Sequence, residues 1–308
     1  MEEMKERLAI KDELSYLKDE RLDKALVLLY PEYTRSFLQR LIGSGHILVG
    51  EKSVKAGYKL KDEDRISICI PEPEVLEIEA EDIPLDIYYE DADIIVINKP
   101  KHMVVHPAAG HTSGTLVNAL MYHCKDSLSG VNGVMRPGIV HRIDMDTTGL
   151  LVACKNDRAH NAMAEKFQTH DITRVYTAIC HNHFKEENGI IDKPIGRAKS
   201  DRKKMAVDPS GKHAVTHYTV RANLAQNLSL VECRLETGRT HQIRVHMASI
   251  SHPLLGDELY GPKQKPFHTE GQALHAGTLG FVHPTTGEYM EWTAPLPAYM
   301  NDIIEKLS

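Results

Sequence analysis

A short acidic stretch with three prolines divides this 308-residue chain into a small N-terminal part and a larger C-terminal part. Residues 71–84 (PEPEVLEIEAEDIP) contain Pro71, Pro73 and Pro84 among six acidic residues. Proline fixes φ and removes a backbone donor, and clustered like charges extend a chain, so this composition favours an extended linker. We therefore expect a small domain over residues 14–73, a linker over 74–88 and one large domain over 89–308.

The composition indicates a globular chain. Hydrophobic residues make up 42% of it, which is enough to bury a substantial core. No stretch reaches the roughly 18 uncharged apolar residues that cross a bilayer, and the first thirty residues are too charged for a signal peptide. The five cysteines are scattered without a C-x-x-C pair, which indicates neither a disulfide framework nor a thiolate zinc site. We expect a cytoplasmic protein with free thiols.

Charge is segregated along the chain. The formal net charge of −6 argues mildly against nucleic-acid binding as a bulk property, but the positions of the charges matter more than their sum. Residues 66–98 hold ten acidic residues and no Lys or Arg. Residues 197–212 hold six basic residues against two acids: Arg197, Lys199, Arg202, Lys203, Lys204 and Lys212. One face could thus attract phosphate while another repels it.

The small domain is expected to pack two helices against short strands. Apolar residues at helical spacing before Pro31 predict a first helix: Leu22, Ala25, Leu26 and Leu29. Thr34 can cap a second helix, which Gly43 ends and whose apolar side consists of Phe37, Leu38, Leu41 and Ile42. Residues 47–49, Val54 and residues 66–70 are expected to form short strands.

This part of the chain resembles the RNA-binding module of small-subunit ribosomal protein S-four. The resemblance lies in the pattern RLDKAL…TRSFLQRLIGSGHILVGEKSVKAGYKLKDEDRI. In that family the second helix and the turn after it present basic side chains to RNA phosphates. The resemblance therefore implies RNA contacts by Arg35 and Arg40, with Lys52 and Lys55 as further candidates. A charged, solvated helix face is the alternative interpretation.

The large domain mixes strands and helices without a regular alternation. Strands are predicted over residues 94–98, 139–140, 150–153, 175–180, 214–220 and 228–235. Helices are predicted over residues 115–123, 157–170 and 240–251. Because strands predominate and helices only interrupt them, we expect an α+β fold with a mixed, largely antiparallel sheet flanked by helices, and not a doubly wound fold.

The most informative segment is residues 138–152, GIVHRIDMDTTGLLV. Two apolar, strand-like runs bracket a polar loop that contains His141, Arg142, Asp144 and Asp146. Polar groups this dense between buried strands require an explanation, because burying them unpaired costs free energy. One explanation is a turn in which Asp and Thr side chains bond nearby backbone groups. The other is a site that carries chemistry.

The segment closely resembles the central motif of RluA-type pseudouridine synthases, G-x-x-H-R-L-D-x-x-T-x-G-L, with Ile143 in place of the usual Leu. Three further segments match that family in the same order: NKPKHMVVHPAAG at residues 98–110, RVYTAI at 174–179 and ETGRTHQIRVHMASISHPLLGDELYG at 236–261. The resemblance covers nearly all of residues 89–297. It implies the pseudouridine synthase fold and an enzyme that isomerises uridine in RNA without a cofactor.

Three chemical residues follow from this resemblance, position by position. Asp144 corresponds to the catalytic aspartate, Tyr176 to the tyrosine that lies against the target uracil, and Arg244 to the basic partner of the aspartate. The reaction cuts the bond between ribose and uracil N1 and rejoins the ribose to C5. A carboxylate must attack the sugar or the uracil, or remove a ribose proton, and the sequence leaves these routes open. A guanidinium beside that carboxylate would oppose the cost of desolvating it.

The same resemblance implies contacts with RNA around the reacting uridine. A stacked uridine must be flipped out before it can react, at a cost of a few kcal/mol. Arg142 is the candidate for a side chain that fills the gap and contacts phosphate, and His141 for one that supports the loop beside the RNA. The basic run GRAKSDRKKM favours further phosphate contacts by Arg202, Lys203 and Lys204, with a solvated loop as the alternative.

Two other chemistries are weaker interpretations. Asp144 and Asp146 could form a glycosidase pair of carboxylates, but the family motif requires no acid at position 146, and loop hydrogen bonding is the simpler role. Eighteen histidines suggest a metal site, particularly His241 with His246. A spacing of five does not place these two well on one helix face, and no zinc signature is present. We therefore expect no metal.

The expected partner is structured RNA, bound by a monomer without membrane contact. Family members with an appended N-terminal RNA-binding module resemble those that act on large-subunit ribosomal RNA, so this substrate is favoured, with transfer RNA as the alternative. A hypothesis of a different class is a non-catalytic RNA-binding factor in ribosome assembly that keeps the fold only as a clamp. The presence of Asp144, Tyr176 and Arg244 together disfavours it.

Overall fold

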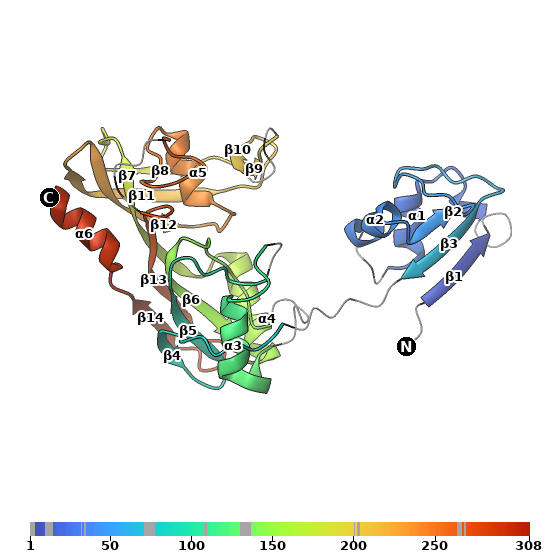
Figure 1. The fold of residues 1–308 in the computed structure, drawn as a ribbon, viewed down its shortest axis with the longest axis horizontal. Helices are drawn as coiled ribbons and strands as arrows, with labels where there is room; N and C mark the ends of the chain where they lie inside the picture. The colour runs from blue at the N-terminus through green and yellow to red at the C-terminus, as the bar shows by residue number, and fades with distance from the viewer. Residues whose placement is uncertain are drawn as a thin grey trace. The chain divides into compact units, whose positions relative to one another are not determined.

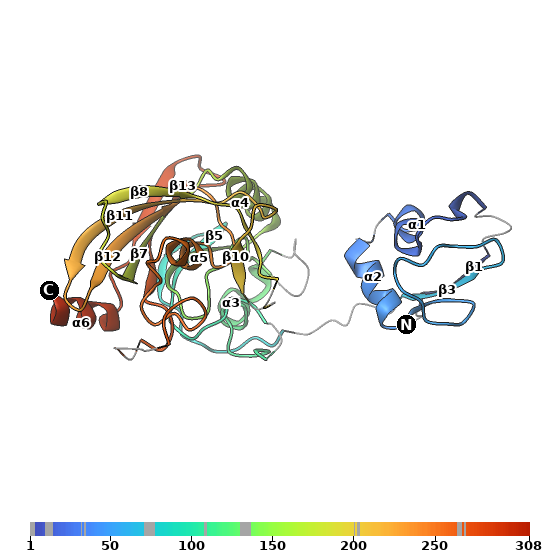
Figure 2. The ribbon, with the colours of Figure 1, turned by 90° about the horizontal axis from the view of Figure 1, so that it is seen from above.

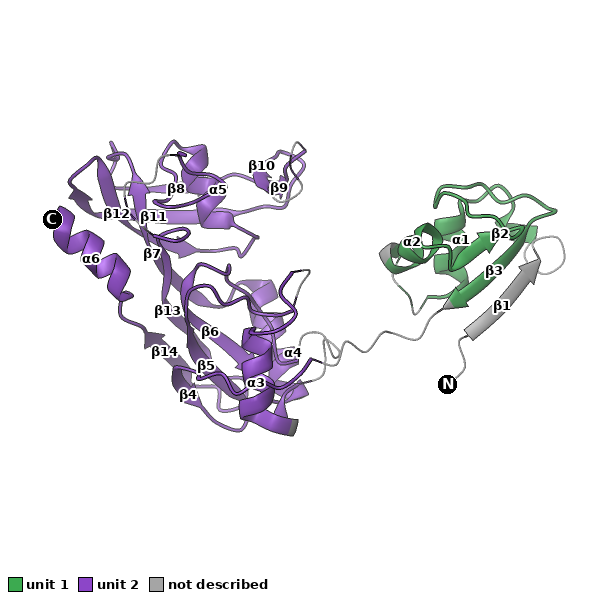
Figure 3. Cartoon of the chain, in the orientation of Figure 1, with its two compact units in different colours: residues 1–75 green, residues 76–308 purple. Residues whose placement is uncertain are grey.

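The computed structural model describes residues 4–9, 15–31, 33, 35–70, 78–107, 110–129, 137–199, 201, 204–263, 267 and 269–308. The chain divides into two compact units, residues 1–75 and 76–308, which Figure 3 colours separately. Residues 71–77, where the expected linker begins, lie outside the described part of the chain. The domain boundaries expected at residues 73 and 88 therefore remain predictions.

The first unit contains two short helices and a three-stranded antiparallel sheet of order β1-β3-β2 (Figure 1). Its elements are β1 (Met4–Ala9), a 3-10 turn (Ser15–Leu17), α1 (Leu22–Leu29), α2 (Arg35–Gly43), β2 (Ile47–Val49) and β3 (Arg65–Ile70). Both helices pack their apolar sides on the strands in one core that includes Leu22, Leu26, Leu38, Ile42, Ile47 and Ile66. The predicted helices and the strands at 47–49 and 66–70 are confirmed, whereas Val54 belongs to no strand and Thr34 lies outside the described residues.

The second unit is built on one nine-stranded sheet, in the order β4-β5-β6-β13-β7-β12-β11-β8, with β14 paired to β13. A separate two-stranded ribbon joins β9 and β10. The strands are β4 (Ile87–Glu90), β5 (Ile94–Lys99), β6 (Thr148–Cys154), β7 (Thr173–His181), β8 (Asn188–Asp192), β9 (Ile195–Arg197), β10 (Met205–Val207), β11 (Val215–Leu224), β12 (Leu228–Leu235), β13 (Leu274–Val282) and β14 (Tyr289–Thr293). The helices are α3 (Leu116–Cys124), α4 (Asp157–Thr169), α5 (Gln242–Ser249) and α6 (Ala298–Leu307), with a 3-10 turn at Lys125–Ser127.

Helices cover both faces of this sheet (Figures 1 and 2). Side chains alternate along a strand, so Ile95 and Ile97 of β5 point to one face and Ile94 and Val96 to the other. The first pair shares a core with α3 and α5, and the second shares a core with α4. Helix α6 packs on β7, β11 and β12 through Met300, Ile303 and Leu307.

Strand β13 pairs with different strands along its length. Near its start β13 pairs in parallel with β6, at His275 with Thr148 and at Ala276 with Gly149, and farther along it pairs with β14. Gly149 has φ 115°, and a Cβ at this position would lie 2.3 Å from the Ala276 carbonyl oxygen. Only glycine tolerates both the dihedral angle and the approach. The end of the polar loop that precedes β6 is therefore fixed against β13.

The fold class expected from the sequence is confirmed, since every strand pair in the large sheet except β6 with β13 is antiparallel. The three predicted helices are α3, α4 and α5, and five predicted strands are β5, β6, β7, β11 and β12. Residues 139–140 form only an isolated bridge, between Ile139 and Ala153. The other strands and α6 were not expected. Among the described residues, no helix is long and apolar enough to span a bilayer.

Candidate active site

The polar loop before β6, residues 141–147, carries Asp144 and is called here the Asp144 loop. Its last residue closes a turn, since the Thr147 N–H donates to the Asp144 carbonyl oxygen at 3.1 Å. Gln272, just before β13, donates from Nε2 to Thr147 Oγ1 at 3.0 Å. One hydrogen bond within the loop and one from Gln272 thus hold the loop in place. The Asp144 side chain remains 18% exposed.

Lys99, the last residue of β5, is a buried lysine that sequence reasoning missed. Its side chain is fully buried, and Nζ donates to the carbonyl oxygens of Pro100, Met103 and Met145 at 2.7, 2.9 and 2.9 Å. Burial lowers the pKa of Lys99 to about 7, against the opposite effect of the nearby carboxylates. In its protonated form the group has three protons, and these three carbonyl oxygens accept all of them. Lys99 therefore ties the segment after β5 to the Asp144 loop; a lysine ending the apolar strand IIVINK was the only sequence signal.

Arg244 joins two carboxylates. Its Nε and Nη2 donate to Asp257 at 2.7 and 2.8 Å, and its Nη1 donates to Asp144 Oδ2 at 2.9 Å. Burial disfavours the charge on Arg244, but its hydrogen bonds and its attraction to Asp257 and Asp144 outweigh burial and raise its pKa above the usual range. The two-pronged contact with Asp257 holds the plane of the guanidinium, so Nη1 is directed at Asp144.

Helix α5 positions Arg244 from within the core. Residues 242–247 are all buried, so this part of the helix has no solvent face. Gln242 fixes its start, because Oε1 accepts from the Arg239 N–H at 2.9 Å and Nε2 donates to the Val215 carbonyl oxygen at 2.9 Å. Sequence reasoning missed Asp257, the partner of Arg244. An arginine inside such a buried helix requires a nearby acid, and that requirement was the available signal.

Two adjoining pockets open beside Asp144. The inner pocket, of about 60 Å³, is lined among others by Asp144, Tyr176 and Arg244. The outer pocket, of about 510 Å³, shares Asp144 and Tyr176 and extends towards Phe167 and Arg174. Tyr176 comes from the middle of β7, and burial raises the pKa of its phenol. The structure therefore brings together Asp144, Tyr176 and Arg244 from three distant segments of the chain.

The two residues before Ile143 differ in their surroundings. Arg142 is exposed and lines both pockets. His141 stacks on Phe167 with ring centroids 4.3 Å apart, and its Nε2 accepts from the Val152 N–H at 3.0 Å. Burial, aided by the positive charge of Arg174, lowers the pKa of His141 to about 3, so the ring is neutral. His141 thus braces the loop against β6 and also lines the outer pocket.

His241 is a second neighbour of Asp144. Its Nε2 lies 3.8 Å from Asp144 Oδ1, and its Nδ1 lies 2.9 Å from the Tyr260 hydroxyl. That hydroxyl also accepts from the Met205 N–H at 2.8 Å, which links the β9–β10 ribbon to the site. His246 points elsewhere, to Thr216 Oγ1 and the Lys193 carbonyl oxygen. The two histidines therefore do not face a common point where one metal ion could bind. Sequence reasoning considered His241 only as a metal ligand.

Asp146 lies away from the pockets. His102 Nδ1 is 3.0 Å from its Oδ1, and a Cβ on Gly271 would lie 2.6 Å from its Cβ. Asp146 lines neither pocket beside Asp144. This geometry supports loop bracing by Asp146 and gives no support to a glycosidase pair.

The expected RNA-contacting residues outside the pockets occupy different environments. Arg35 donates to the buried Asp23 at 2.8 Å, so part of its fork is already engaged. The guanidinium carbon of Arg40 lies 5.2 Å from the centre of the Phe37 ring. Lys204 is half-buried between β9 and β10. Two further expected contacts, Arg202 and Lys203, lie outside the described residues.

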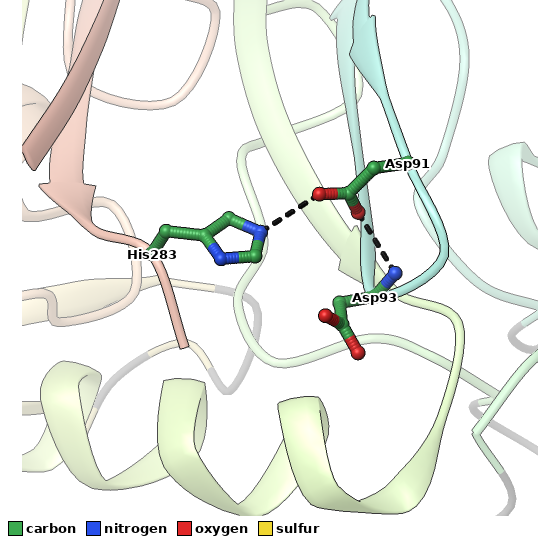
Figure 4. A group of neighbouring side chains, drawn as sticks. All are labelled: Asp91, Asp93 and His283. Atoms are coloured by element: carbon green, nitrogen blue, oxygen red, sulfur yellow. Dashed lines mark hydrogen bonds and ion pairs between the residues drawn. The ribbon is translucent and has the colours of Figure 1, made fainter. Parts of the chain in front are cut away.

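One group of described residues has the chemistry of metal ligands, and none of its members lines the pockets. Ligand atoms of Asp91, Asp93 and His283 lie within 4.8 Å of one another (Figure 4). His283 Nε2 is 2.9 Å from Asp91 Oδ2, and Asp91 Oδ1 accepts from the Asp93 N–H at 2.8 Å. The contact between Asp91 and Asp93 closes the turn between β4 and β5, and His283 approaches Asp91 from the segment after β13. The expected absence of a metal remains a prediction.

Comparisons with known proteins place both parts of the chain in known families. Residues 93–249 match the family model for RNA pseudouridylate synthase, and residues 20–66 match the S4 domain. An uncharacterized RNA pseudouridine synthase of Bacillus subtilis is 54% identical over 290 residues, which cover 94% of this chain and 95% of that protein. The ribosomal large subunit pseudouridine synthase D of Zymomonas mobilis is 47% identical, with 93% of each chain covered.

A solved structure gives the same assignment. Human RNA pseudouridylate synthase domain containing 1 aligns with a TM-score of 0.58 and 26% identity, over 77% of this chain and 91% of that one. The family resemblance read from the sequence is confirmed. Because the family model spans half of the chain and relatives match along nearly all of it, this protein belongs to the RNA pseudouridine synthases, a family of isomerases, and carries an N-terminal S4 domain.

Proposed function

We propose that this protein isomerises uridine in large-subunit ribosomal RNA, with Asp144 as the catalytic carboxylate, Tyr176 against the uracil and Arg244 as the fixed partner of Asp144. One observation carries the assignment of residues. The Arg244 guanidinium is held by Asp257 on one side and donates to Asp144 on the other, at the wall of a pocket that Tyr176 also lines.

The chemistry requires few groups. The N1–C1′ bond breaks, a C5–C1′ bond forms, the C5 proton leaves and N1 takes up a proton. Asp144 starts this sequence either by attacking the sugar or the uracil, or by removing a ribose proton. Since Arg244 engages Oδ2, the oxygen that remains for this step is Oδ1. Tyr176, kept neutral by its raised pKa, contacts the base and can relay the C5 proton through its hydroxyl.

The substrate assignment rests on the relatives and on the first unit. Relatives from Zymomonas mobilis and Haemophilus influenzae, 47% and 44% identical, are ribosomal large subunit pseudouridine synthases D. An S4 domain adds a second RNA contact, for which we propose Arg35 and Arg40. We propose that Arg142 enters the gap left by the flipped uridine, that His141 supports it, and that Arg202, Lys203 and Lys204 contact phosphate.

The test maps pseudouridine in total RNA from cells with the gene, without it, and complemented with Asp144→Asn or Asp146→Asn. The Asp144 variant keeps size and most hydrogen bonds but loses the charge that makes a nucleophile or base, so turnover should fall by several orders of magnitude. The Asp146 variant should keep substantial activity because its carboxylate lies outside the pockets.

Each outcome of the mapping decides between the alternatives. Sites that disappear from large-subunit ribosomal RNA support the proposal, whereas sites that disappear only from transfer RNA would replace its substrate. An unchanged map would favour the non-catalytic assembly factor. Near-normal turnover by Asp144→Asn would overturn the assignment of the carboxylate.

We infer further that the protein acts as a monomer in the cytoplasm. Asp144, Tyr176, Arg244 and Asp257 all come from one chain, so the pocket needs no second copy. Light scattering of the purified protein and cell fractionation test the two inferences.

A further inference from the structure

The outer pocket contains the buried guanidinium of Arg174. Arg174, on β7, is only 6% exposed. Its Nη2 donates to the Glu236 carbonyl oxygen at a long 3.3 Å, and its buried Nε has no hydrogen-bond partner. Within the described part of the chain, no carboxylate pairs with it. A buried, uncompensated cation costs several kcal/mol, and an anion in the pocket would offset that cost.

The surroundings hold the Arg174 fork in the pocket wall. Its guanidinium carbon lies 5.8 Å from the centre of the Phe167 ring. Gly238 leaves room for the fork, because a Cβ at that position would lie 2.5 Å from Arg174 Nη1. Phe167 and Gly238 also line the outer pocket. The fork is thus positioned by an aromatic ring on one element and a glycine on another, which is the kind of preorganisation that a binding site needs.

Other groups in the same pocket add to the positive charge. Arg142 and Arg239 line it together with Arg174, and the only carboxylate in the described lining is Asp144, which Arg244 already engages. Arg239 Nε is bound to a carbonyl oxygen, that of His213 at 2.9 Å, and not to an acid. The described lining therefore carries three guanidinium groups against one paired carboxylate, and it favours an anion.

The distance between Arg174 and Tyr176 suggests which anion. The two buried residues alternate with half-buried neighbours on β7, so their side chains point to the same face of the sheet. Residues two positions apart on a strand are separated by about 6.6 Å. One nucleotide can span this distance from its base to its phosphate. A planar guanidinium fork matches phosphate oxygens in a bidentate manner.

We propose that Arg174, supported by Arg239, forms a subsite for one of the two phosphodiester groups that flank the flipped uridine. The subsite fixes the nucleotide from its phosphate end while Tyr176 and Asp144 meet the base and sugar. This assignment rests on the proposed function for the identity of the nucleotide, but the anion subsite itself does not depend on it.

The first arm of the test uses inorganic phosphate. Thermal unfolding of the full chain is followed in increasing sodium phosphate, against sodium chloride of equal ionic strength. Phosphate should raise the midpoint of the wild type by about 3 °C or more once it is well above its Kd, and should do so much less for Arg174→Met. Arg221→Met is the matched control, because Arg221 is an exposed guanidinium on β11 paired with Glu232. It should respond as the wild type does.

The second arm distinguishes an RNA phosphodiester from free phosphate. Filter binding uses a stem-loop with one uridine in its loop and a single neutral methylphosphonate, either 5′ or 3′ of that uridine. One of the two replacements should weaken binding by the wild type and by Arg221→Met about tenfold, as expected for one charge-assisted contact. The same replacement should cost Arg174→Met less than twofold, because that variant has no guanidinium to bind the phosphate.

Three results would overturn the subsite. They are an equal response of wild type and Arg174→Met to phosphate, a methylphosphonate penalty that persists in Arg174→Met, and the absence of any penalty in the wild type. If Arg174→Met does not fold, Gly238→Ala replaces it, since its Cβ displaces the fork without removing the charge, and the same outcomes apply. Failure of the wild type to form pseudouridine would refute the proposed function and leave the phosphate arm intact.

Discussion

Asp257→Asn should damage both the stability and the rate of this enzyme. Asp257 is fully buried as a side chain and accepts from Arg244 Nε and Nη2 at 2.7 and 2.8 Å. Its Oδ1 also accepts from the Leu259 N–H at 2.9 Å. Asparagine keeps the volume but replaces one acceptor by an NH₂ group and removes the charge. Breaking a buried ion pair costs about 3 to 5 kcal/mol. Because Arg244 keeps Asp144, we expect a cost of about 3 kcal/mol, at the lower end of that range.

This destabilisation has a thermal equivalent. In a unit of the size of residues 76–308, each kcal/mol shifts the midpoint by about 2 to 4 °C, so the variant should melt about 6 to 12 °C lower. The rate should fall as well. Once its fork is released, Arg244 no longer aims Nη1 at Asp144, and a misplacement of this kind costs about 100-fold.

Single-turnover pseudouridine formation with excess enzyme and differential scanning calorimetry measure the two effects. Asp93→Asn is the matched control, because Asp93 is also buried and binds Asn156 Nδ2 at 2.7 Å, but lines neither pocket. This variant should lose stability and keep the single-turnover rate. The reasoning is refuted if Asp257→Asn reacts at the wild-type rate, or if Asp93→Asn slows the reaction as much.

Three further predictions concern other parts of the chain. Lys99→Met should slow single-turnover reaction at least tenfold without changing the Kd for RNA, because it releases the Met145 carbonyl and lets the Asp144 loop shift; an unchanged rate would exclude a positioning role. Deleting residues 1–76 should reduce activity on long RNA more than on a short stem-loop, and equal reductions would mean that the S4 unit supports the catalytic fold. Replacing Arg202, Lys203 and Lys204 by Ala should lower the salt slope of binding by about one unit for each phosphate that the variant no longer neutralises, and filter binding with an unchanged slope would make this run a solvated loop.

Local pattern determined much of the fold. The spacing of Leu22, Ala25, Leu26 and Leu29 predicted α1, because one turn of helix brings these side chains onto one face whatever they pack against. The alternation of residues 66–70 predicted β3 for the same kind of reason. Strand β13 escaped prediction because it is buried on both faces along much of its length, so its sequence LHAGTLGFV shows no alternation.

The residues of the candidate site also divide into those that the sequence indicated and those that only the structure revealed. The motif around Asp144 is a run of neighbours in the chain, and its resemblance to a family can be read without any coordinates. The sequence by itself therefore determined the fold class, the family and three residues of the pocket. Their roles in catalysis remain predictions that the variants described above test.

Only the tertiary structure decided which groups surround those residues. Asp257, His241 and Lys99 reach Arg244 or the Asp144 loop from three separate segments. Only the structure shows that no carboxylate of the described residues pairs with Arg174. The physical reason is that hydrogen bonds, ion pairs and burial act over a few ångströms in space, while sequence spacing constrains distance only within a helix or a strand. Arg244 and Asp144, for example, are 100 positions apart in the chain, and their spacing in the sequence sets no distance between them.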